Sequence, residues 1–458
     1  MNIVLLSGGS GKRLWPLSND TRSKQFLKVL KDDDGKQISM VQRVWKQLKN
    51  VDLDQQSVIA TGISQVEMIH NQLCHEVDVV VEPERRDTFP AIALAAVYLY
   101  SIRGVSLNEV IAVLPVDSYV EDEFFEKVKE MESALLNSQA DIALLGVEPT
   151  YASEKYGYIV PTNMPGHAYA SVSHFKEKPT EQDAAELIKK HALWNCGVAA
   201  FTLDYMINLL TKAGLPISYD ALSLKYSELE KISFDYAVLE QAENVITLSY
   251  QGKWKDLGTW NTLTEEMSTN IVGKGVIAEE CSNTHLINEL DLPVAVLGIN
   301  DAVVAVSPDG ILVSSKQASP GVKELTETLG GRPMYEERRW GWYRVMDYST
   351  LEDGSEVLTQ RVHIESGKNS SYQVHHRRSE VWTIIQGEAE CVLNERIIPL
   401  KAGDVLQIPS GVKHAIRAIS NVELIEVQSG LELMEQDIVR IRKTWEEIEQ
   451  LMNTHVNS

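Results

Sequence analysis

The sequence predicts an α/β domain with a mixed or parallel sheet, followed by a small β-rich connector and a C-terminal jelly-roll β-barrel. Three successive patterns along the chain support this prediction. Short apolar runs alternate with longer helical patterns over residues 1–265, helical patterns disappear over 266–330, and closely spaced short strands fill 331–432. Residues 433–458 place apolar side chains at helical spacing, which predicts a C-terminal amphipathic helix.

The first domain opens with a short apolar run at 3–6, and similar runs predict strands at 57–61, 79–81, 110–114, 142–147 and 197–201. Helices are expected between them at 38–48, 91–100 and 181–190. Continuous apolar strands separated by helices are typical of a sheet that is covered on both faces. Ligands of such sheets bind beyond the carboxyl ends of the strands, so we expect a site at that edge.

The connector and the barrel are predicted from their turns. Between residues 271 and 315, apolar runs are interrupted by turn sequences such as Pro308-Asp309-Gly310. In the last domain the turns fall at Gly367, Asn394, Gly403 and Gly411. This spacing is typical of the short strands of a small barrel or jelly roll.

Composition and charge exclude several classes of protein. The 458 residues are 44% hydrophobic and 24% charged, which indicates a globular chain of about two to four domains. The net charge is −22, from 43 basic and 65 acidic residues, so we expect neither nucleic-acid nor membrane binding. The four cysteines are too few and too far apart for a disulfide framework or a CxxC motif: Cys74, Cys196, Cys281 and Cys391. The small number of cysteines and an N-terminus that resembles no signal peptide together predict a cytoplasmic protein.

The C-terminal helical pattern carries an apolar face made of Ile438, Ile441, Trp445 and Ile448. Such a face either packs on its own domain or contacts a second copy of the chain. We expect the protein to be a homodimer.

A glycine-rich segment, Gly8-Gly9-Ser10-Gly11-Lys12-Arg13, follows the first predicted strand and its last residue, Leu6. Glycines let backbone N–H groups approach phosphate oxygens, and nearby cations neutralise the charge. A Walker A loop requires Ser or Thr after its Gly-Lys, where this chain has Arg13, and the GxGxxG spacing of dinucleotide-binding folds is missing. A further cation, Lys24, follows about a dozen residues later.

The run from Gly8 to Leu17, followed by Lys24-Gln25-Phe26, resembles the signature of mannose-1-phosphate guanylyltransferases, a group of sugar-phosphate nucleotidyltransferases. More segments match in the family's order: Glu82-Pro83, Arg86-Asp87-Thr88, Pro90-Ala91-Ile92, Leu114-Pro115-Val116-Asp117, Tyr156-Gly157-Tyr158, Glu177-Lys178-Pro179, Trp194-Asn195-Cys196-Gly197, Phe234-Asp235-Tyr236-Ala237 and Trp254-Lys255-Asp256. The resemblance implies a Rossmann-like domain that converts GTP and mannose 1-phosphate to GDP-mannose and diphosphate. The family usually has Asn where this chain has Asp87.

The resemblance also implies residue roles that suit phosphoryl transfer, which depends on positioning and charge neutralisation. Asp117 and Asp256 would share Mg²⁺, a hard cation that prefers oxygen ligands. Arg13 and Lys24 would hold the triphosphate, and Lys178 would hold the sugar phosphate. Nucleotide contacts would come from Leu6, Gly8, Gly9, Gly11, Glu82, Arg86, Thr88 and Pro90, and sugar contacts from Gly157, Glu177 and Asn195. A nucleotidyltransferase for another hexose 1-phosphate or another nucleoside triphosphate is the alternative.

The barrel segment resembles both halves of the cupin pattern, with Gln373 in place of the usual first histidine, followed by His375, Glu380 and His414. Residues two apart on a strand share a face, so Gln373 and His375 can both point into the barrel. Nitrogen and oxygen ligands of this kind suit Zn²⁺ or another divalent ion.

Cupin barrels of this kind, joined to a guanylyltransferase, resemble mannose-6-phosphate isomerases. The resemblance implies interconversion of mannose 6-phosphate and fructose 6-phosphate, with Arg378, Lys413 or Arg440 binding the phosphate. Bifunctional enzymes usually carry two more histidines in the segment that here reads His375-His376-Arg377-Arg378-Ser379-Glu380. Two alternatives therefore stay open for the barrel: an active isomerase, or a sensor that binds a sugar phosphate without converting it.

Overall fold

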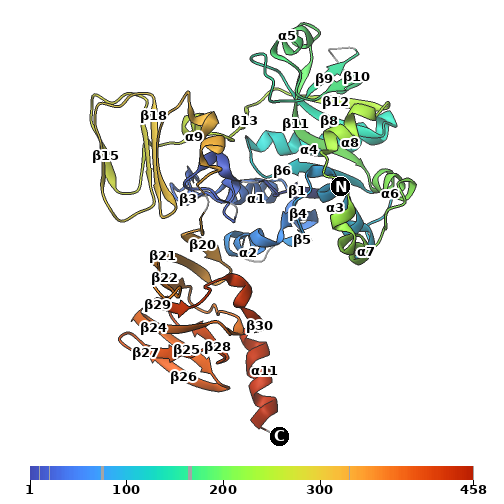
Figure 1. Ribbon diagram of the computed structural model, residues 1–458. Coiled ribbons are helices and arrows are strands. Elements are labelled where there is room, and N and C mark those ends of the chain that lie inside the picture. Colours follow the sequence, from blue (N-terminus) through green and yellow to red (C-terminus); the bar gives the residue numbers. More distant parts are fainter. Residues whose placement is uncertain (10, 20, 74–76, 163–167, 330, 457–458) are drawn as a thin grey trace. The chain divides into compact units, whose positions relative to one another are not determined.

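A computed structural model describes residues 1–9, 11–19, 21–73, 77–162, 168–329 and 331–456 (Figure 1). Cys74 lies outside the described residues. The chain divides into two compact units. The first consists of Met1–Ile287, Val294–Val304 and Val313–Glu327, and the second of Asn288–Pro293, Ala305–Leu312 and Thr328–Ser458. The expected connector, 266–330, is thus shared between the two units.

A nine-stranded sheet in the order β5-β4-β1-β6-β11-β8-β12-β10-β9 forms the centre of the first unit. Its strands are β1 (Asn2–Leu6), β4 (Ser57–Gly62), β5 (Asp78–Glu82), β6 (Val110–Pro115), β8 (Ile142–Val147), β9 (Tyr158–Pro161), β10 (Ala170–Lys176), β11 (Leu193–Thr202) and β12 (Val245–Tyr250). The first four pair in parallel, whereas β11 runs antiparallel to both β6 and β8. The sheet is therefore mixed, and the expected strand 197–201 is part of β11.

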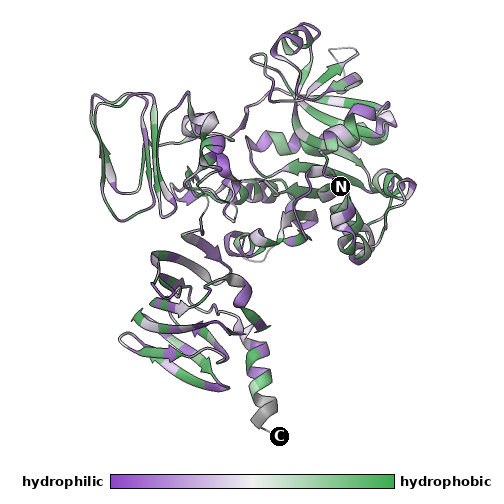
Figure 2. Ribbon diagram, viewed as in Figure 1, coloured by the Kyte–Doolittle hydropathy of each residue, from purple (hydrophilic) through white to green (hydrophobic). Residues whose placement is uncertain are grey.

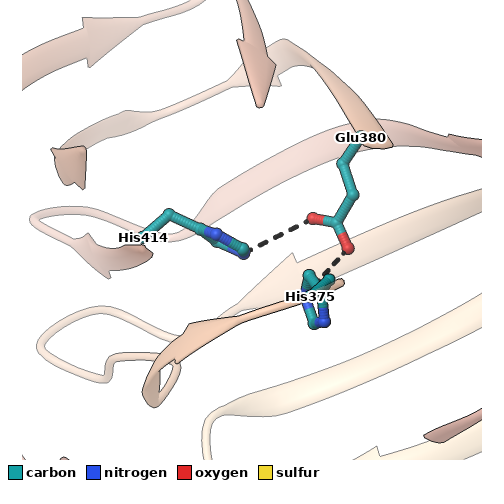
Figure 3. A group of neighbouring side chains, drawn as sticks. All are labelled: His375, Glu380 and His414. Atoms are coloured by element: carbon teal, nitrogen blue, oxygen red, sulfur yellow. Dashed lines mark ion pairs between the residues drawn. The ribbon is translucent and has the colours of Figure 1, made fainter. Parts of the chain in front are cut away.

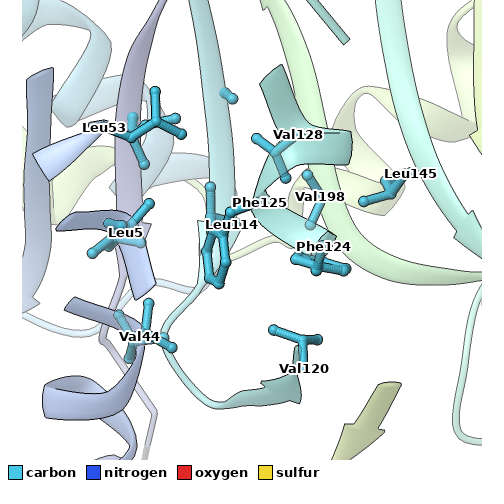
Figure 4. Packing of buried hydrophobic residues seen from close by; sticks show 14 of the residues in the cluster. Leu5, Val44, Leu53, Leu114, Val120, Phe124, Phe125, Val128, Leu145 and Val198 are labelled. Carbon is cyan, nitrogen blue, oxygen red and sulfur yellow. The ribbon is translucent and has the colours of Figure 1, made fainter. Parts of the chain in front are cut away.

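Helices cover both faces of this sheet. The helices in this part of the chain are α1 (Met40–Asn50), α2 (Val66–Leu73), α3 (Thr88–Ser101), α4 (Asp122–Ser138), α5 (Glu181–Lys189), α6 (Leu203–Lys212), α7 (Tyr219–Leu224), α8 (Phe234–Ala237) and α9 (Trp260–Glu266). Alternation along β1 sends Ile3 and Leu5 into the core under α1, α2 and α4, and Val4 into the core under α3, α6 and α7. Figure 4 shows the first of these cores, to which Val44 of α1 and Phe124 of α4 contribute.

Local sequence explains where helices begin. The hydroxyl of Ser39 accepts a hydrogen bond from the Gln42 backbone N–H, and the Gln42 side chain accepts one from the Ser39 backbone N–H, which forms a capping box at the start of α1. The Thr180 hydroxyl caps α5 by accepting a hydrogen bond from the Asp183 backbone N–H. Figure 2 shows that hydrophobic residues concentrate in the strands of the central sheet. None of the helices in the described residues is long and apolar enough to cross a membrane.

Short elements lie between the strands of the large sheet and after them. The hairpin β2 (Leu30–Lys31) and β3 (Gln37–Ile38) comes early in the chain, and β7 (Ser118–Val120) pairs with β13 (Trp254–Asp256). The connector strands are β14 (Ile271–Val272), β15 (Gly275–Ile277), β16 (His285–Asn288), β17 (Val294–Val296), β18 (Ala302–Ser307) and β19 (Gly310–Ser315), followed by the helix α10 (Val322–Thr326). β14 pairs in parallel with β16, and β15 with β17, which confirms the expected β-rich character.

The second unit contains a jelly-roll barrel of two facing sheets, as expected. The six-stranded sheet contains β20 (Tyr335–Arg338), β21 (Gly341–Thr350), β22 (Glu356–Ile364), β29 (Val422–Gly430), β24 (Arg378–Gln386) and β27 (Val405–Ile408). The five-stranded sheet contains β26 (Arg396–Lys401), β25 (Glu388–Leu393), β28 (His414–Ala418), β23 (Tyr372–Val374) and β30 (Val439–Arg442). Buried side chains from both sheets, such as Ile384 and Ile416, share one apolar core.

The expectation of a continuous helix over 433–458 is wrong. Residues Val439–Arg442 form β30, because their backbone pairs with β23 and extends the five-stranded sheet. The helix α11 (Trp445–Val456) begins only after this strand. Its apolar residues Trp445 and Ile448 pack against Tyr372, so this part of the predicted apolar face covers its own domain.

Candidate functional site

The glycine-rich loop lies at the carboxyl end of β1 and is held against the segment that carries Lys24. A Cβ on Gly11 would lie 2.5 Å from the Cα of Ser23, so only glycine permits this close approach. The Ser23 hydroxyl donates to the Gly9 carbonyl at 2.6 Å, and the Gln25 amide donates to the Ser7 carbonyl at 3.1 Å. These contacts fix the position of the loop relative to Lys24.

Lys24 joins the two acidic residues that were predicted to converge. Its Nζ lies 2.8 Å from Asp117 Oδ2 and 2.9 Å from Asp256 Oδ1. Antiparallel pairing of β7 with β13 places Asp256 opposite Ser118, next to Asp117. Burial alone would lower the pKa of Lys24, but the two carboxylates raise it above its ordinary value.

Two carboxylate oxygens directed at one point form a donor set that suits Mg²⁺. Arg13 was expected to hold the triphosphate together with Lys24. It is exposed and makes no hydrogen bond or ion pair with a described residue. The structure therefore brings Lys24, Asp117 and Asp256 together, and leaves Arg13 at the surface of the same loop.

Glu82 ends β5 beside the glycine loop. A Cβ on Gly8 would lie 3.2 Å from Glu82 Oε1, and the Tyr226 hydroxyl donates to Glu82 Oε2 at 2.6 Å. Burial raises the pKa of the Glu82 carboxyl. Leu6, at the end of β1, pairs with Pro115 on β6 at the same edge of the sheet. Tyr226 was not predicted, since no motif surrounds it in the sequence.

Arg86, Thr88 and Pro90, which were also expected to contact the nucleotide, lie beside the segment before α8. Arg86 donates to the Leu229 carbonyl at 2.6 Å and pairs with Glu84 at 2.6 Å. Thr88 Oγ1 accepts a hydrogen bond from the Phe234 backbone N–H at 2.8 Å, and Pro90 is buried in the first turn of α3. These contacts connect the start of α3 to the segment before α8.

The expected sugar contacts lie together. A Cβ on Gly157 would lie 2.5 Å from Glu177 Oε2, which explains why this position carries glycine. The Asn195 backbone N–H donates to the Gly157 carbonyl at 2.8 Å. Lys178 pairs with Glu177 at 2.5 Å, and its backbone φ of 42° is unusual for a side-chain-bearing residue. The Lys178 side chain is half exposed, so its ammonium can reach a ligand.

Asp235 on α8 belongs to the same cluster. The sequence did not predict it as a site residue, although its segment matches a motif of the family. The Asn195 amide donates to Asp235 Oδ1 at 2.9 Å. Burial, followed by the neighbouring Glu177, raises the pKa of Asp235 to about 6.

In the barrel, His375, Glu380 and His414 converge (Figure 3), with ligand atoms that lie within 4.8 Å of one another. His375 Nε2 lies 3.2 Å from Glu380 Oε1, and His414 Nε2 lies 3.6 Å from Glu380 Oε2. His414 Nδ1 is 3.0 Å from the Val412 carbonyl and so carries the proton. Its Nε2 is buried without a hydrogen-bond partner and is free to bind a metal ion.

Gln373 takes a different orientation from the one expected. Its Nε2 lies 3.3 Å from His375 Nε2, whereas its Oε1 accepts a hydrogen bond from the Ser371 hydroxyl at 2.8 Å. The Ser371 hydroxyl holds the amide oxygen in this structure, so Gln373 would join the other ligands only after its amide turns. The three remaining side chains form a nitrogen and oxygen donor set that fits Zn²⁺ or a similar ion.

The three expected phosphate-binding residues of the barrel differ in position. Arg378 is buried, donates to Glu380 Oε1 at 3.1 Å and lies 3.2 Å from His375 Nε2. Arg440 is exposed on β30 in register with Gln373, and Lys413 precedes His414. Burial would raise the pKa of Glu380, but His375, His414 and Arg378 hold it below the ordinary range.

A second buried carboxyl, Glu426 on β29, was missed. Gln360 Nε2 donates to Glu426 Oε2 at 3.0 Å, and Gln428 Nε2 donates to Oε1 at 2.6 Å. Burial and the nearby Glu380 raise the pKa of Glu426 above its ordinary value. The alternation of β29 gives a signal, since Glu426 and Gln428 occupy the same inward face as Leu424.

Comparison with known protein families identifies both parts of the chain. The family model described as "Nucleotidyl transferase" matches residues 2–271, more than half of the chain. The chain belongs to this family. A second model, "Mannose-6-phosphate isomerase C-terminal", matches residues 332–443. This nucleotidyltransferase therefore ends in a domain of the isomerase type.

Full-length relatives share both parts of the enzyme. The mannose-1-phosphate guanylyltransferase RfbM of Salmonella typhimurium is 28% identical over 478 residues, covering 96% of each chain. The xanthan biosynthesis protein XanB of Xanthomonas campestris is 29% identical, covering 96% of this chain and 98% of its own. The alginate biosynthesis protein AlgA of Pseudomonas fluorescens is 30% identical over 475 residues, covering 95% of each chain.

A solved structure supports the fold of the first part. The crystal structure described as mannose-1-phosphate geranyltransferase from Thermus thermophilus superimposes with a TM-score of 0.60 at 29% identity. It covers 72% of this chain and 98% of its own. The α/β nucleotidyltransferase fold expected from the sequence is thus confirmed.

Proposed function

We propose that this enzyme is a mannose-1-phosphate guanylyltransferase, which converts GTP and α-D-mannose 1-phosphate to GDP-mannose and diphosphate. The observation that carries the proposal is the convergence of Lys24, Asp117 and Asp256 beside the glycine-rich loop. The names of the full-length relatives support the choice of substrates.

The reaction needs positioning and charge neutralisation. An oxygen of the sugar phosphate forms a bond to the α-phosphorus of GTP, and the bond to the bridging oxygen breaks as diphosphate leaves. Asp117 and Asp256 would hold Mg²⁺, which when bound neutralises phosphate oxygens. Lys24 and Arg13 would neutralise the triphosphate, and Lys178 the attacking sugar phosphate.

Recognition would be divided between two groups of residues. The backbone of Gly8, Gly9 and Gly11 would approach the phosphates, and Glu82 would accept hydrogen bonds from the nucleotide. Arg86, Thr88 and Pro90 would act on the nucleotide through the fold of their segment, since their contacts are to the chain itself. Gly157, Glu177 and Asn195 would bind the sugar.

The test is an assay of diphosphate release with each nucleoside triphosphate and each hexose 1-phosphate. The proposal predicts the highest kcat/KM for GTP with mannose 1-phosphate. A higher value for another pair would establish the alternative, a nucleotidyltransferase of different specificity, and no product with any pair would reject the transfer reaction.

For the barrel, we propose that His375, Glu380 and His414 hold Zn²⁺ or another divalent ion, with Gln373 joining after rotation of its amide. The free Nε2 of His414 supports this site. The barrel would interconvert mannose 6-phosphate and fructose 6-phosphate, with Arg378, Lys413 and Arg440 as candidates for contact with the phosphate.

The isomerase reaction is tested by a coupled assay on the full chain after loading with Zn²⁺. Turnover supports an isomerase. Binding of mannose 6-phosphate without turnover would instead support the sensor. The proposal further includes a homodimer in the cytoplasm, with a product that feeds polysaccharide synthesis, as the names of the xanthan and alginate relatives suggest.

A further inference from the structure

Asp235 has no role in the proposed reaction, although it lies in a motif that matches the family. It is the second residue of α8, a helix of four residues. Among the described residues, its only side-chain hydrogen-bond partner is the amide of Asn195, at 2.9 Å. The second oxygen, Oδ2, accepts no hydrogen bond from another described residue.

The charged groups that face Asp235 come from two other segments of the chain. Glu177 and Lys178 follow β10, and Asp87 precedes α3. Asn195 on β11 completes this environment. Asp235 therefore lies among the residues expected to bind the sugar and its phosphate, where the carboxylates of Glu177 and Asp87 disfavour its charge and the ammonium of Lys178 favours it.

The position of Asp235 is fixed by backbone contacts that involve no ligand. The Phe234 N–H donates to Thr88 Oγ1 at 2.8 Å, and the Phe89 N–H donates to the Ile232 carbonyl at 3.2 Å. Arg86 holds the Leu229 carbonyl. Because the segment is anchored in this way, its fold does not depend on the Asp235 carboxylate.

A carboxylate placed here is costly. Burial and Glu177 both disfavour its charged form, which is why its pKa rises to about 6. Perturbed carboxyls that lie among ligand-binding residues are candidates for function. Lys178 offsets part of this cost, and the hydrogen bond to the Asn195 amide uses only Oδ1, so Oδ2 remains available to a ligand.

We propose that Asp235 is a specificity-determining residue of the hexose site: Oδ1 orients the Asn195 amide, and Oδ2 accepts a hydrogen bond from a hydroxyl of the hexose. This inference rests on the proposed guanylyltransferase function. Asn195 Oδ1 accepts a hydrogen bond from the Gly197 N–H at 3.1 Å, so its amide is held at both ends and keeps one Nδ2 hydrogen for the sugar.

The chemistry accounts for discrimination between hexoses. Epimers such as mannose and glucose differ in the direction of one hydroxyl, and an acceptor at a fixed position distinguishes these directions. A site built to bond a hydroxyl rejects a ligand that leaves its buried polar group unpaired. Two fixed groups, Asp235 and Asn195, provide an acceptor and a donor for this purpose.

Asp235→Asn tests the role of Oδ2, because its amide oxygen can still accept from Asn195 while the second position becomes a donor. Asp235→Ala removes both contacts. We expect KM for mannose 1-phosphate to rise about tenfold or more in both variants, the usual effect of losing a hydrogen bond to a charged group. KM for GTP should stay within about twofold, and the preference for mannose 1-phosphate over glucose 1-phosphate should fall by a similar factor.

The control is Asp220→Asn, which changes an exposed acid on α7 and should leave all constants unchanged. If Asp235→Asn keeps the wild-type KM and hexose preference, the proposal is wrong. Equal increases in KM for GTP and for mannose 1-phosphate, together with a lower unfolding temperature, would show that Asp235 stabilises the fold. That result would also reject the proposal. Inactivity of the wild-type enzyme with all hexose 1-phosphates would instead reject the proposed function.

Discussion

The ammonium of Lys24 bridges the carboxylates of Asp117 and Asp256, at 2.8 and 2.9 Å. A divalent ion bound by the same two oxygens would lie too close to this ammonium, since both carry positive charge. If Mg²⁺ takes these two oxygens, as proposed, Lys24 must move, and its Nζ then becomes available for the phosphates. The proposed metal site thus implies that Lys24 and the metal ion compete for one pair of carboxylates.

Removing the ammonium of Lys24 should tighten metal binding and abolish the nucleotidyl transfer. We expect Lys24→Met to bind Mn²⁺ about tenfold more tightly, or about 1.4 kcal/mol. Electron paramagnetic resonance of free Mn²⁺ measures this in a His375→Ala, His414→Ala background, which lacks the barrel site. Lys31→Met, an exposed lysine on β2, is the control. Unchanged or weaker Mn²⁺ affinity in Lys24→Met would show that no competition exists.

Asp117→Asn should lower kcat/KM for GDP-mannose formation by about 10²–10³, the usual cost of losing a group that stabilises the transition state. Any isomerase activity should persist, because the barrel has its own ligands. Steady-state assays of both reactions on the same preparation measure the two effects, with Asp220→Asn as the control. Loss of both activities in a folded variant would contradict the two-site arrangement.

Glu380→Gln and His414→Ala should reduce the Zn²⁺ content of the loaded chain and remove any isomerase activity. His414→Ala deletes one of the three converging ligand atoms, and Glu380→Gln removes the negative charge of another. Metal analysis after gel filtration measures the content, and diphosphate release should remain at the wild-type rate. Retention of one tightly bound Zn²⁺ per chain in both variants would exclude this cluster as the metal centre.

Glu426→Gln should stabilise the enzyme at neutral pH. The raised pKa of Glu426 means that the unfolded glutamate ionises at a pH at which the folded one stays neutral. The contribution of the neutral Glu426 carboxyl to the free energy of unfolding is therefore fully present below the ordinary glutamate pKa. It falls as pH rises towards the raised pKa of the folded protein. The unfolding temperature of Glu426→Gln should exceed that of the wild type at pH 7 in a chelating buffer, and the difference should shrink at pH 4.

The control for this prediction is Glu388→Gln, an exposed glutamate on β25. Glu388→Gln should have the wild-type unfolding temperature at both pH 7 and pH 4. A difference between Glu426→Gln and the wild type that does not change with pH would mean that the carboxyl is ionised in the folded barrel.

Gly11→Ala should displace the glycine-rich loop, because the added Cβ would lie 2.5 Å from the backbone of Ser23. We expect a higher KM for GTP, by about tenfold, and a lower unfolding temperature. Gly62→Ala is the matched control, since no atom lies within 4 Å of its added Cβ and its φ of −71° suits alanine. Similar unfolding temperatures for the two variants would contradict the close approach.

The sequence predicted elements with strong local patterns. The apolar run 142–147 forms β8 with the expected bounds, and the helix expected at 38–48 forms α1. The spacing of His375, Glu380 and His414 predicted their convergence, because strand alternation determines which side chains share a face. Ordered motifs likewise predicted that Asp117 and Asp256 would approach each other.

Features that depend on contacts between distant segments were not predictable in this way. Residues 439–442 fit a helical pattern, yet become β30 because β23 offers backbone partners. The amide of Gln373 turns towards Ser371, which local spacing cannot reveal. Asp235 and Glu426 gain their properties from burial beside Glu177 and Glu380, groups that lie far from them along the chain.

The pairing of β13 with β7 has a consequence for synthesis of the protein. All nine strands of the large sheet precede residue 254, whereas Asp256 is delivered by β13. A nascent chain that has released only its first 250 residues can complete the sheet but holds one acidic residue of the pair. The proposed pair of metal ligands can therefore assemble only after the ribosome has extruded β13.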